Sequence, residues 1–224
     1  MKQNTWFDPF FVLENLSAED KLIQKNVKDF SNKVLKPIVI KSNRNHYFDR
    51  ELYKKFGKLG LLGSSIKNHG GAGASDTAYG LIAYEIEKID SSYRSSISVQ
   101  SSLVIHPIDT FGTEEQKEKY LPDLISGHKI GCFGLTENEA GSDPSSMKTT
   151  YKKHQDGYVL NGSKNWITNS PIADVFIIWA LNESNETNSI KGFILDKNIK
   201  IYMTNTMKMR IILLINPNYQ IYII

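Results

Sequence analysis

The sequence predicts an α+β fold, with a helical domain first and an antiparallel β domain second. Apolar residues recur at three- and four-residue steps through the first half of the chain, which is typical of the buried face of a helix. This period stops at about Ser126 and Gly127. Beyond that point, short apolar runs are separated by polar, turn-forming residues, which is typical of strands. We therefore place the helical domain at residues 1–127 and the β domain at residues 128–197.

Two capping patterns mark where helices of the first domain begin. Ser17 precedes Asp20 by three residues, and Thr113 precedes Gln116 by three, so each threonine or serine can cap a helix that follows it. Four apolar stripes supply the inward faces: Ile23, Val27, Phe30, Val34 and Ile38; Ala78, Ile82, Ile86 and Ile89; Ile97, Val104, Ile108 and Phe111; and Leu121, Leu124 and Ile125.

The second domain is predicted from strand and turn signals. Asn161 and Gly162 form the dipeptide that most strongly favours a tight hairpin turn. Residues 174–179 and 192–195 are apolar runs of strand length, and the polar residues 182–189 between them predict a loop.

Residues 198–224 differ in composition from the rest of the chain. They contain no glycine and no acidic residue, and neither a helical nor an alternating period persists. We expect this segment to lie outside the fold, as a disordered tail or as the product of a reading frame shifted near residue 198.

Composition narrows the class of protein. The chain has 224 residues, 40% of them hydrophobic, and a net charge of +3, so no nucleic-acid or membrane partner is indicated. The single cysteine, Cys132, lies in an apolar run and is expected to be a small buried side chain. The five histidines show no metal-ligand spacing. We expect a soluble protein of the bacterial cytoplasm, with the mitochondrial matrix as the alternative.

A turn dense in Gly, Ser, Thr and Asp follows the apolar run at residues 131–133. Gly134 and Gly141 allow close approach of the main chain, and Thr136 and Ser142 supply hydroxyls. Such a turn can hold the polar edge of a bound ring, although on composition alone an ordinary surface turn is the commoner structure. The nearby Glu137 and Glu139 are expected to be solvated.

A second candidate is the run Trp166, Ile167 and Thr168. A strand would present Trp166 and Thr168 on one face, where an indole can pack against a flat ring. The alternative is a half-buried tryptophan in an ordinary sheet.

The order of several motifs resembles the N-terminal and middle domains of acyl-CoA dehydrogenases over residues 6–197. The motifs are LGLLG at 59–63, QKEKYLP at 116–122, FGLTE at 133–137, GSD at 141–143 and NGSKNWIT at 161–168. The resemblance implies FAD as cofactor and an incomplete middle domain of that type. It implies flavin contacts from Phe133, Leu135, Thr136, Gly141, Ser142, Trp166, Ile167 and Thr168.

Residues 87–102 and 169–174 resemble glutaryl-CoA dehydrogenase more narrowly. This resemblance implies that Arg94 meets the distal carboxylate of the substrate, and an arginine fork suits a carboxylate. Ser98 would share the helix face of Arg94, and Glu87 could orient the guanidinium. Ser95 and Ser142 complete the implied substrate site. The alternative is a surface arginine that pairs locally.

The implied reaction is oxidation and decarboxylation of glutaryl-CoA to crotonyl-CoA, with a short-chain monocarboxylic acyl-CoA as the alternative substrate. In the family, a glutamate of a C-terminal helical bundle removes the α-proton. We find no such bundle in these residues and assign no catalytic base. The resemblance also implies electron-transfer flavoprotein as partner and a homotetramer for the full-length family. For this chain we expect a truncated, inactive form that binds FAD weakly or not at all, or a non-catalytic interaction fragment.

Overall fold

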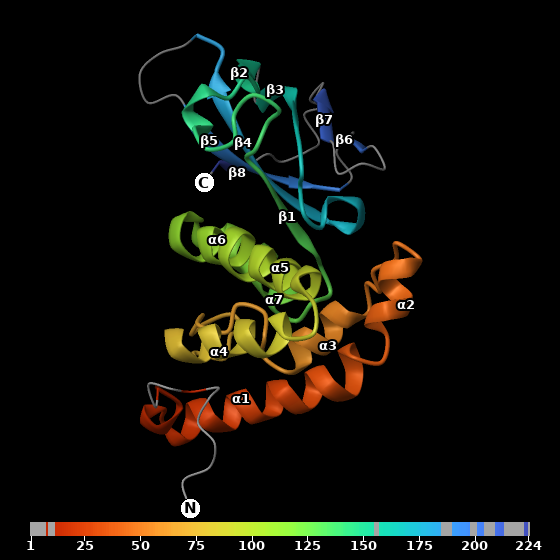
Figure 1. Ribbon diagram of the computed structural model, residues 1–224. Coiled ribbons are helices and arrows are strands. Elements are labelled where there is room, and N and C mark those ends of the chain that lie inside the picture. The colour runs from red at the N-terminus through yellow and green to blue at the C-terminus, as the bar shows by residue number, and fades with distance from the viewer. Residues whose placement is uncertain are drawn as a thin grey trace, which may run out of the picture.

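The computed structural model describes residue 8 and residues 12–154, 157–184, 190–197, 201–203, 209–212 and 222–223. Helices stack in one part of the molecule and the strands form a sheet beside them (Figure 1). The helices are α1 (Ala18–Phe30), α2 (Val39–Arg44), α3 (Leu52–Lys58), α4 (Asp76–Glu87), α5 (Ser91–Ser98), α6 (His106–Phe111) and α7 (Glu114–Ile125). The strands are β1 (Gly131–Gly134), β2 (Thr150–His154), β3 (Gly157–Lys164), β4 (Val175–Asn182), β5 (Ile190–Asp196), β6 (Ile201–Met203), β7 (Met209–Ile212) and β8 (Tyr222–Ile223).

Both predicted caps are confirmed. The Ser17 hydroxyl accepts a hydrogen bond from the Asp20 backbone at 3.0 Å and begins α1. At α7, Thr113 Oγ1 accepts from Gln116 N at 3.3 Å, and Gln116 Oε1 accepts from Thr113 N at 2.8 Å. Each cap satisfies a backbone N–H that has no partner inside its helix.

The apolar stripes pack into one core that also receives side chains from the sheet. α1 continues into a π-helical segment, Ser31–Leu35, and α5 runs through Val99–Ile105 into α6 without a break. Val104, Ile177 and Ile194 meet in this core. Phe111 is the exception among the predicted inward residues, because it lies at the end of α6 and is 67% exposed.

The sheet has the order β6-β7-β3-β2-β4-β5-β8, and β1 pairs with β4. Most pairs are antiparallel, as predicted. However, β1 and β2 both run parallel to β4, so the sheet is mixed. β4 and β5 confirm the two apolar runs as strands. No helix among the described residues is long and apolar enough to cross a membrane.

The predicted hairpin turn at Asn161 and Gly162 is wrong. Both residues lie within β3, where Asn161 pairs with Thr150 of β2 and with Ile212 of β7. Close packing against Thr149, and not a turn, explains the glycine at position 162. A Cβ placed there would lie 2.3 Å from Thr149 Oγ1, and the backbone has φ +157°. The connection between β2 and β3 falls at residues 155–156, outside the described residues.

Part of the segment 198–224, which we expected to lie outside the fold as a disordered or out-of-frame tail, forms strands. β7 pairs with β3 and with β6, and β8 pairs with β5. The remaining residues of this segment lie outside the described part of the chain, and a shifted reading frame stays a prediction.

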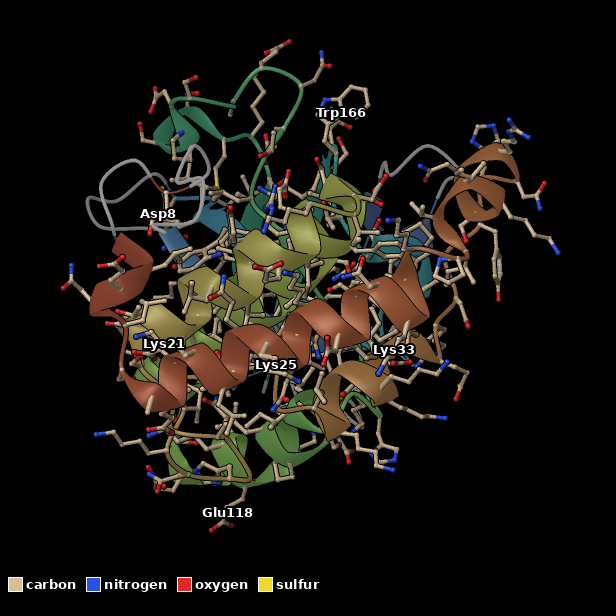
Figure 2. All side chains as sticks on the ribbon, turned by 60° about the horizontal axis from the view of Figure 1, so that its bottom comes forward. Asp8, Lys21, Lys25, Lys33, Glu118 and Trp166 are labelled. Atoms are coloured by element: carbon tan, nitrogen blue, oxygen red, sulfur yellow. The ribbon has the colours of Figure 1, made fainter. Side chains whose placement is uncertain are left out.

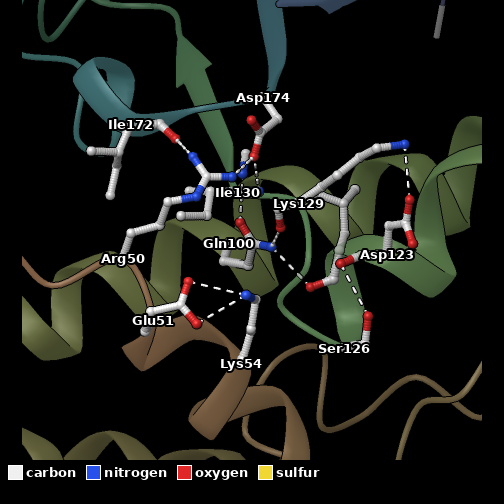
Figure 3. Close-up of polar contacts among 12 residues, drawn as sticks. Arg50, Glu51, Lys54, Gln100, Asp123, Ser126, Lys129, Ile130, Ile172 and Asp174 are labelled. Carbon is white, nitrogen blue, oxygen red and sulfur yellow. Dashed lines mark hydrogen bonds and ion pairs between the residues drawn. The ribbon is translucent and has the colours of Figure 1, made fainter.

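A polar junction joins the helices to the start of the sheet (Figure 3). Gln100 is fully buried, and its Nε2 donates to the carbonyls of Leu124 and Lys129, each at 2.9 Å. Its Oε1 accepts from Gly131 N at 2.7 Å. Arg50 donates to the Ile172 carbonyl at 2.7 Å and pairs with Asp174. β1 therefore leaves the helical domain in a fixed direction.

The packing at Gly162 predicts opposite effects for two glycine-to-alanine changes. Gly162→Ala should lower the free energy of unfolding by about 1–3 kcal/mol, because the new methyl group overlaps Thr149. Gly80→Ala should raise it by about 0.5–1 kcal/mol, because Gly80 is in α4 with nothing within 4 Å of the Cβ position. Urea unfolding of both variants checks this. Equal stability of Gly162→Ala and the unaltered chain would contradict the close packing of Gly162 against Thr149.

Candidate functional site

Two loops meet at the edge of the sheet. The first, here the β1–β2 loop, comprises residues 135–149, and the second, the post-β3 loop, comprises residues 165–169. The backbone N–H of Asn165 donates to the Thr136 carbonyl at 2.9 Å. This bond places the segment at Phe133–Ser142 beside the segment at Trp166–Thr168, two candidates that lie far apart in the sequence.

Trp166 does not lie in a strand, so that prediction is wrong. β3 ends at Lys164, and Trp166 has φ +61° and Asn169 φ +69°, which turn the chain. Trp166 is 73% exposed and projects from the molecule (Figure 2), whereas Ile167 is buried. An exposed indole beside a polar loop presents a flat apolar surface to a planar ring.

The β1–β2 loop is polar, and it is exposed at Gly141 and Ser142, two of the residues predicted to contact FAD. Gly141 and Ser142 are exposed, and a Cβ at Gly141 would meet nothing within 4 Å. Thr136 and Thr168 are partly buried. A Cβ at Gly134 would lie 2.6 Å from Ile178 Cδ1 and 3.3 Å from Lys164 Cγ, so Gly134 faces side chains in the interior of the sheet. Phe133 packs edge-on against Trp179, with ring centroids 6.1 Å apart.

A buried ion pair lies beneath the two loops. Lys164 Nζ donates to Glu137 Oε1 at 2.7 Å and to the Leu135 carbonyl at 3.0 Å. The Lys164 side chain is 0% exposed and the Glu137 side chain 8%. Glu137 also accepts from the backbone N–H groups of Lys148 at 2.6 Å and Thr149 at 2.9 Å. The expectation that Glu137 is solvated is therefore wrong. Glu139 is exposed as expected and pairs with Lys148.

The charges of this pair are held by its hydrogen bonds. Burial opposes ionisation of Glu137, but the bonds from Lys164, Thr149 and Lys148 outweigh it and hold the pKa of Glu137 below its ordinary value. Burial lowers the pKa of Lys164, and the neighbouring Glu137 carboxylate counteracts part of that shift. Burial likewise raises the pKa of Cys132, which is fully buried as predicted.

Of the five predicted substrate residues, four lie on α4 and α5 (Glu87, Arg94, Ser95 and Ser98), whereas Ser142 lies in the β1–β2 loop. Arg94 Nε donates to Glu87 Oε2 at 2.6 Å, and Ser91 Oγ donates to Glu87 Oε1 at 2.7 Å. The hydrogen bond from Arg94, followed by that from Ser91, lowers the pKa of Glu87. Arg94 binds Glu87 through Nε. The two terminal nitrogens of Arg94 lie along a different edge of the guanidinium group. Ser95 and Ser98 are partly buried on the same helix.

Asn169 links these residues to the two loops. Its Nδ2 donates to the Ser96 carbonyl of α5 at 3.3 Å and to the Gly131 carbonyl of β1 at 3.1 Å. α5, which carries Arg94, is thus attached to the loop that carries Trp166. Sequence reasoning missed the roles of Asn169, Asn165 and Lys164. Their partners are distant in sequence, so the motif at residues 161–168, which contains Lys164 and Asn165, did not indicate these contacts.

Among the described residues, no group of three or more His, Cys, Asp or Glu side chains is placed to hold a metal ion. The arrangement instead offers hydroxyls, backbone groups and an indole around an open polar loop. This set fits a planar, polar-edged organic group better than a metal.

Comparison with known proteins gives the same assignment for both halves of the chain. The profile of the acyl-CoA dehydrogenase N-terminal domain matches residues 17–128, and that of the acyl-CoA dehydrogenase middle domain matches residues 132–210. The second match extends past residue 197, where the sequence resemblance was expected to stop.

Individual relatives agree. An acyl-CoA dehydrogenase of Bacillus subtilis (strain 168) is 40% identical over 186 residues, which cover 82% of this chain and 49% of the relative. A short-chain-specific acyl-CoA dehydrogenase of Clostridium acetobutylicum is 38% identical over 188 residues, 83% of this chain and 50% of the relative. The chain thus spans about half the length of the curated relatives it matches.

A solved structure shares the fold. A glutaryl-CoA dehydrogenase from Mycobacterium smegmatis in complex with FADH2 superposes with a TM-score of 0.86 at 35% identity, over 92% of this chain and 55% of that one. With both domain profiles matched in order, the chain belongs to the acyl-CoA dehydrogenase family.

Proposed function

We propose that this chain forms the flavin-facing part of an FAD-dependent acyl-CoA dehydrogenase that acts on glutaryl-CoA. The observation that carries the proposal is the bond between Asn165 N and the Thr136 carbonyl. It brings the two segments that resemble the flavin wall of the family into one surface. That surface is open at Gly141 and exposes Trp166.

The residues of this surface fit FAD. Phe133, Leu135, Thr136, Gly141 and Ser142 would face the polar ring edge from the β1–β2 loop, and Trp166, Ile167 and Thr168 would cover it from the post-β3 loop. Bound FAD supplies a hydride acceptor at its N5 position, which no amino-acid side chain offers. The hydroxyls of Thr136 and Thr168 are suited to hydrogen-bond ring nitrogens and oxygens.

Arg94 favours a dicarboxylic thioester as substrate. The Glu87 carboxylate holds Arg94 at Nε, which preorganises the guanidinium for a second carboxylate. Ser95, Ser98 and Ser142 would add hydroxyl donors. Loss of CO2 after oxidation would then yield crotonyl-CoA. The second candidate is a short-chain monocarboxylic acyl-CoA, because a short-chain-specific enzyme is 38% identical to this chain.

The complete reaction needs groups that the described residues do not supply. No catalytic base is assigned among them, and by family resemblance a glutamate of a C-terminal helical domain would take the α-proton. Electron-transfer flavoprotein is the proposed electron acceptor, and a homotetramer the proposed assembly of the complete enzyme. A non-catalytic role for this chain alone is the alternative.

Titration of the 224-residue chain with FAD tests the proposed function. We expect weak, saturable quenching of flavin fluorescence, with Trp166→Ala lowering the affinity by about tenfold because a stacked aromatic contact is lost. Phe111→Ala, which removes an exposed aromatic residue of α6, is the matched control and should leave the affinity unchanged. A titration without saturation would contradict the proposal.

Binding of two thioesters tests the substrate. Arg94→Met should weaken binding of glutaryl-CoA by about tenfold or more, because a charge-assisted hydrogen bond is lost, and should leave butyryl-CoA unaffected. Isothermal titration calorimetry of both ligands measures this, with the exposed Arg44→Met of α2 as control. An equal effect of Arg94→Met on both thioesters would exclude the dicarboxylate assignment.

A further inference from the structure

We infer that Lys164 and Glu137 act as a positioning pair, which orients the peptide between Leu135 and Thr136 so that the Thr136 N–H faces the flavin. The inference rests on the proposed function and adds to it two residues that would not touch the cofactor. It is drawn from the direction of three hydrogen bonds beneath the β1–β2 loop.

Two consecutive residues at the end of β3 bind two consecutive carbonyls of the loop. Lys164 Nζ donates to the Leu135 carbonyl at 3.0 Å, and Asn165 N donates to the Thr136 carbonyl at 2.9 Å. In a trans peptide, the C=O of one residue and the N–H of the next point in opposite directions. Because Lys164 holds the Leu135 carbonyl inward, the Thr136 N–H points away from the buried pair.

Glu137 keeps Lys164 in this position. A lysine with no exposed surface needs a partner for its charge, and Glu137 provides one at 2.7 Å. Glu137 is in turn bound by the backbone N–H groups of Lys148 and Thr149, at the far end of the same loop. The Glu137 carboxylate therefore connects the start and the end of the β1–β2 loop to Lys164, the last residue of β3.

Packing alone does not require this arrangement. Met147 Sδ lies 3.9 Å from Lys164 Nζ, so an apolar side chain could fill the same space. An apolar residue would leave the Leu135 carbonyl without its donor and free the peptide to rotate. The charged pair is thus best explained by the direction it imposes on the loop main chain.

The test compares two doubly substituted chains. Lys164→Met with Glu137→Gln removes both buried charges and nearly keeps their volume, and the new amide oxygen can still accept from one of the two backbone N–H groups, Lys148 N or Thr149 N, which bind different oxygens of Glu137. Lys148→Met with Glu139→Gln removes the exposed pair of the same loop and is the control. FAD affinity, the visible absorption band of bound flavin, and amide hydrogen exchange of the flavin-free chains are measured.

We expect the buried-pair variant to bind FAD about tenfold more weakly, the size of one lost hydrogen bond, and to shift the flavin band. Exchange should rise together in residues 135–149 and 165–169 and stay unchanged in α1 and α4. The control should match the unaltered chain. Wild-type affinity, band and exchange in the buried-pair variant would overturn the inference.

Two further outcomes are decisive. If the unaltered chain does not bind FAD, the proposed function fails, while exchange still decides the pair: joint loosening of both loops supports it, and unchanged exchange overturns it. If the double variant does not fold, Glu137→Gln alone is used. It removes the charge that holds Lys164 in place, so a shifted flavin band supports the inference, and an unchanged band overturns it.

Discussion

The site depends on the burial of one positive charge. Lys164 is fully buried at the end of β3, and a buried ammonium is costly unless a carboxylate and further acceptors surround it. Glu137 and the Leu135 carbonyl supply them, and both belong to the loop that follows β1. Satisfying the lysine therefore requires this loop to fold back over β3. The post-β3 loop begins at the next residue and is brought beside it.

The helical domain adds a second constraint, which relates the loops to the proposed substrate site. Gln100 fixes the start of β1, and Arg50 with Asp174 fixes the start of β4. Asn169 then binds α5 and β1 at once. The helix that carries Arg94 is held against the strand and the loop of the proposed flavin-facing surface. Oxidation of a thioester needs such fixed separation between a substrate anchor and a hydride acceptor.

Local patterns in the sequence predicted local structure well. The caps at Ser17 and Thr113 involve residues three apart, and the helical stripes repeat within a few turns, so neighbouring residues suffice to identify them. The motifs also identified the two segments that form the candidate site. Their contact was implied only by resemblance. The bond from Asn165 N to the Thr136 carbonyl joins the residue after β3 to the loop after β1, and no local pattern predicts such a bond.

The errors arose where distant residues decide the conformation. Asn161 and Gly162 favour a turn by themselves, but pairing of β3 on both sides keeps them in a strand. Trp166 and Thr168 have the two-residue spacing of one face of a strand, but the positive φ of Trp166 turns the chain there. Glu137 resembles a solvated turn residue until Lys164, which lies at the end of β3, is placed beside it. Such tertiary overrides carry no signal in a short window of sequence.

Photolabelling with 8-azido-FAD tests most directly whether these two loops form a flavin-facing surface. The chain is illuminated with the reagent, with and without excess FAD as competitor, and is then digested. Mass spectrometry identifies the modified peptides. We expect labelling within residues 133–142 and 165–169 that excess FAD prevents. Competable labelling confined to the helices α1–α4 would contradict this expectation.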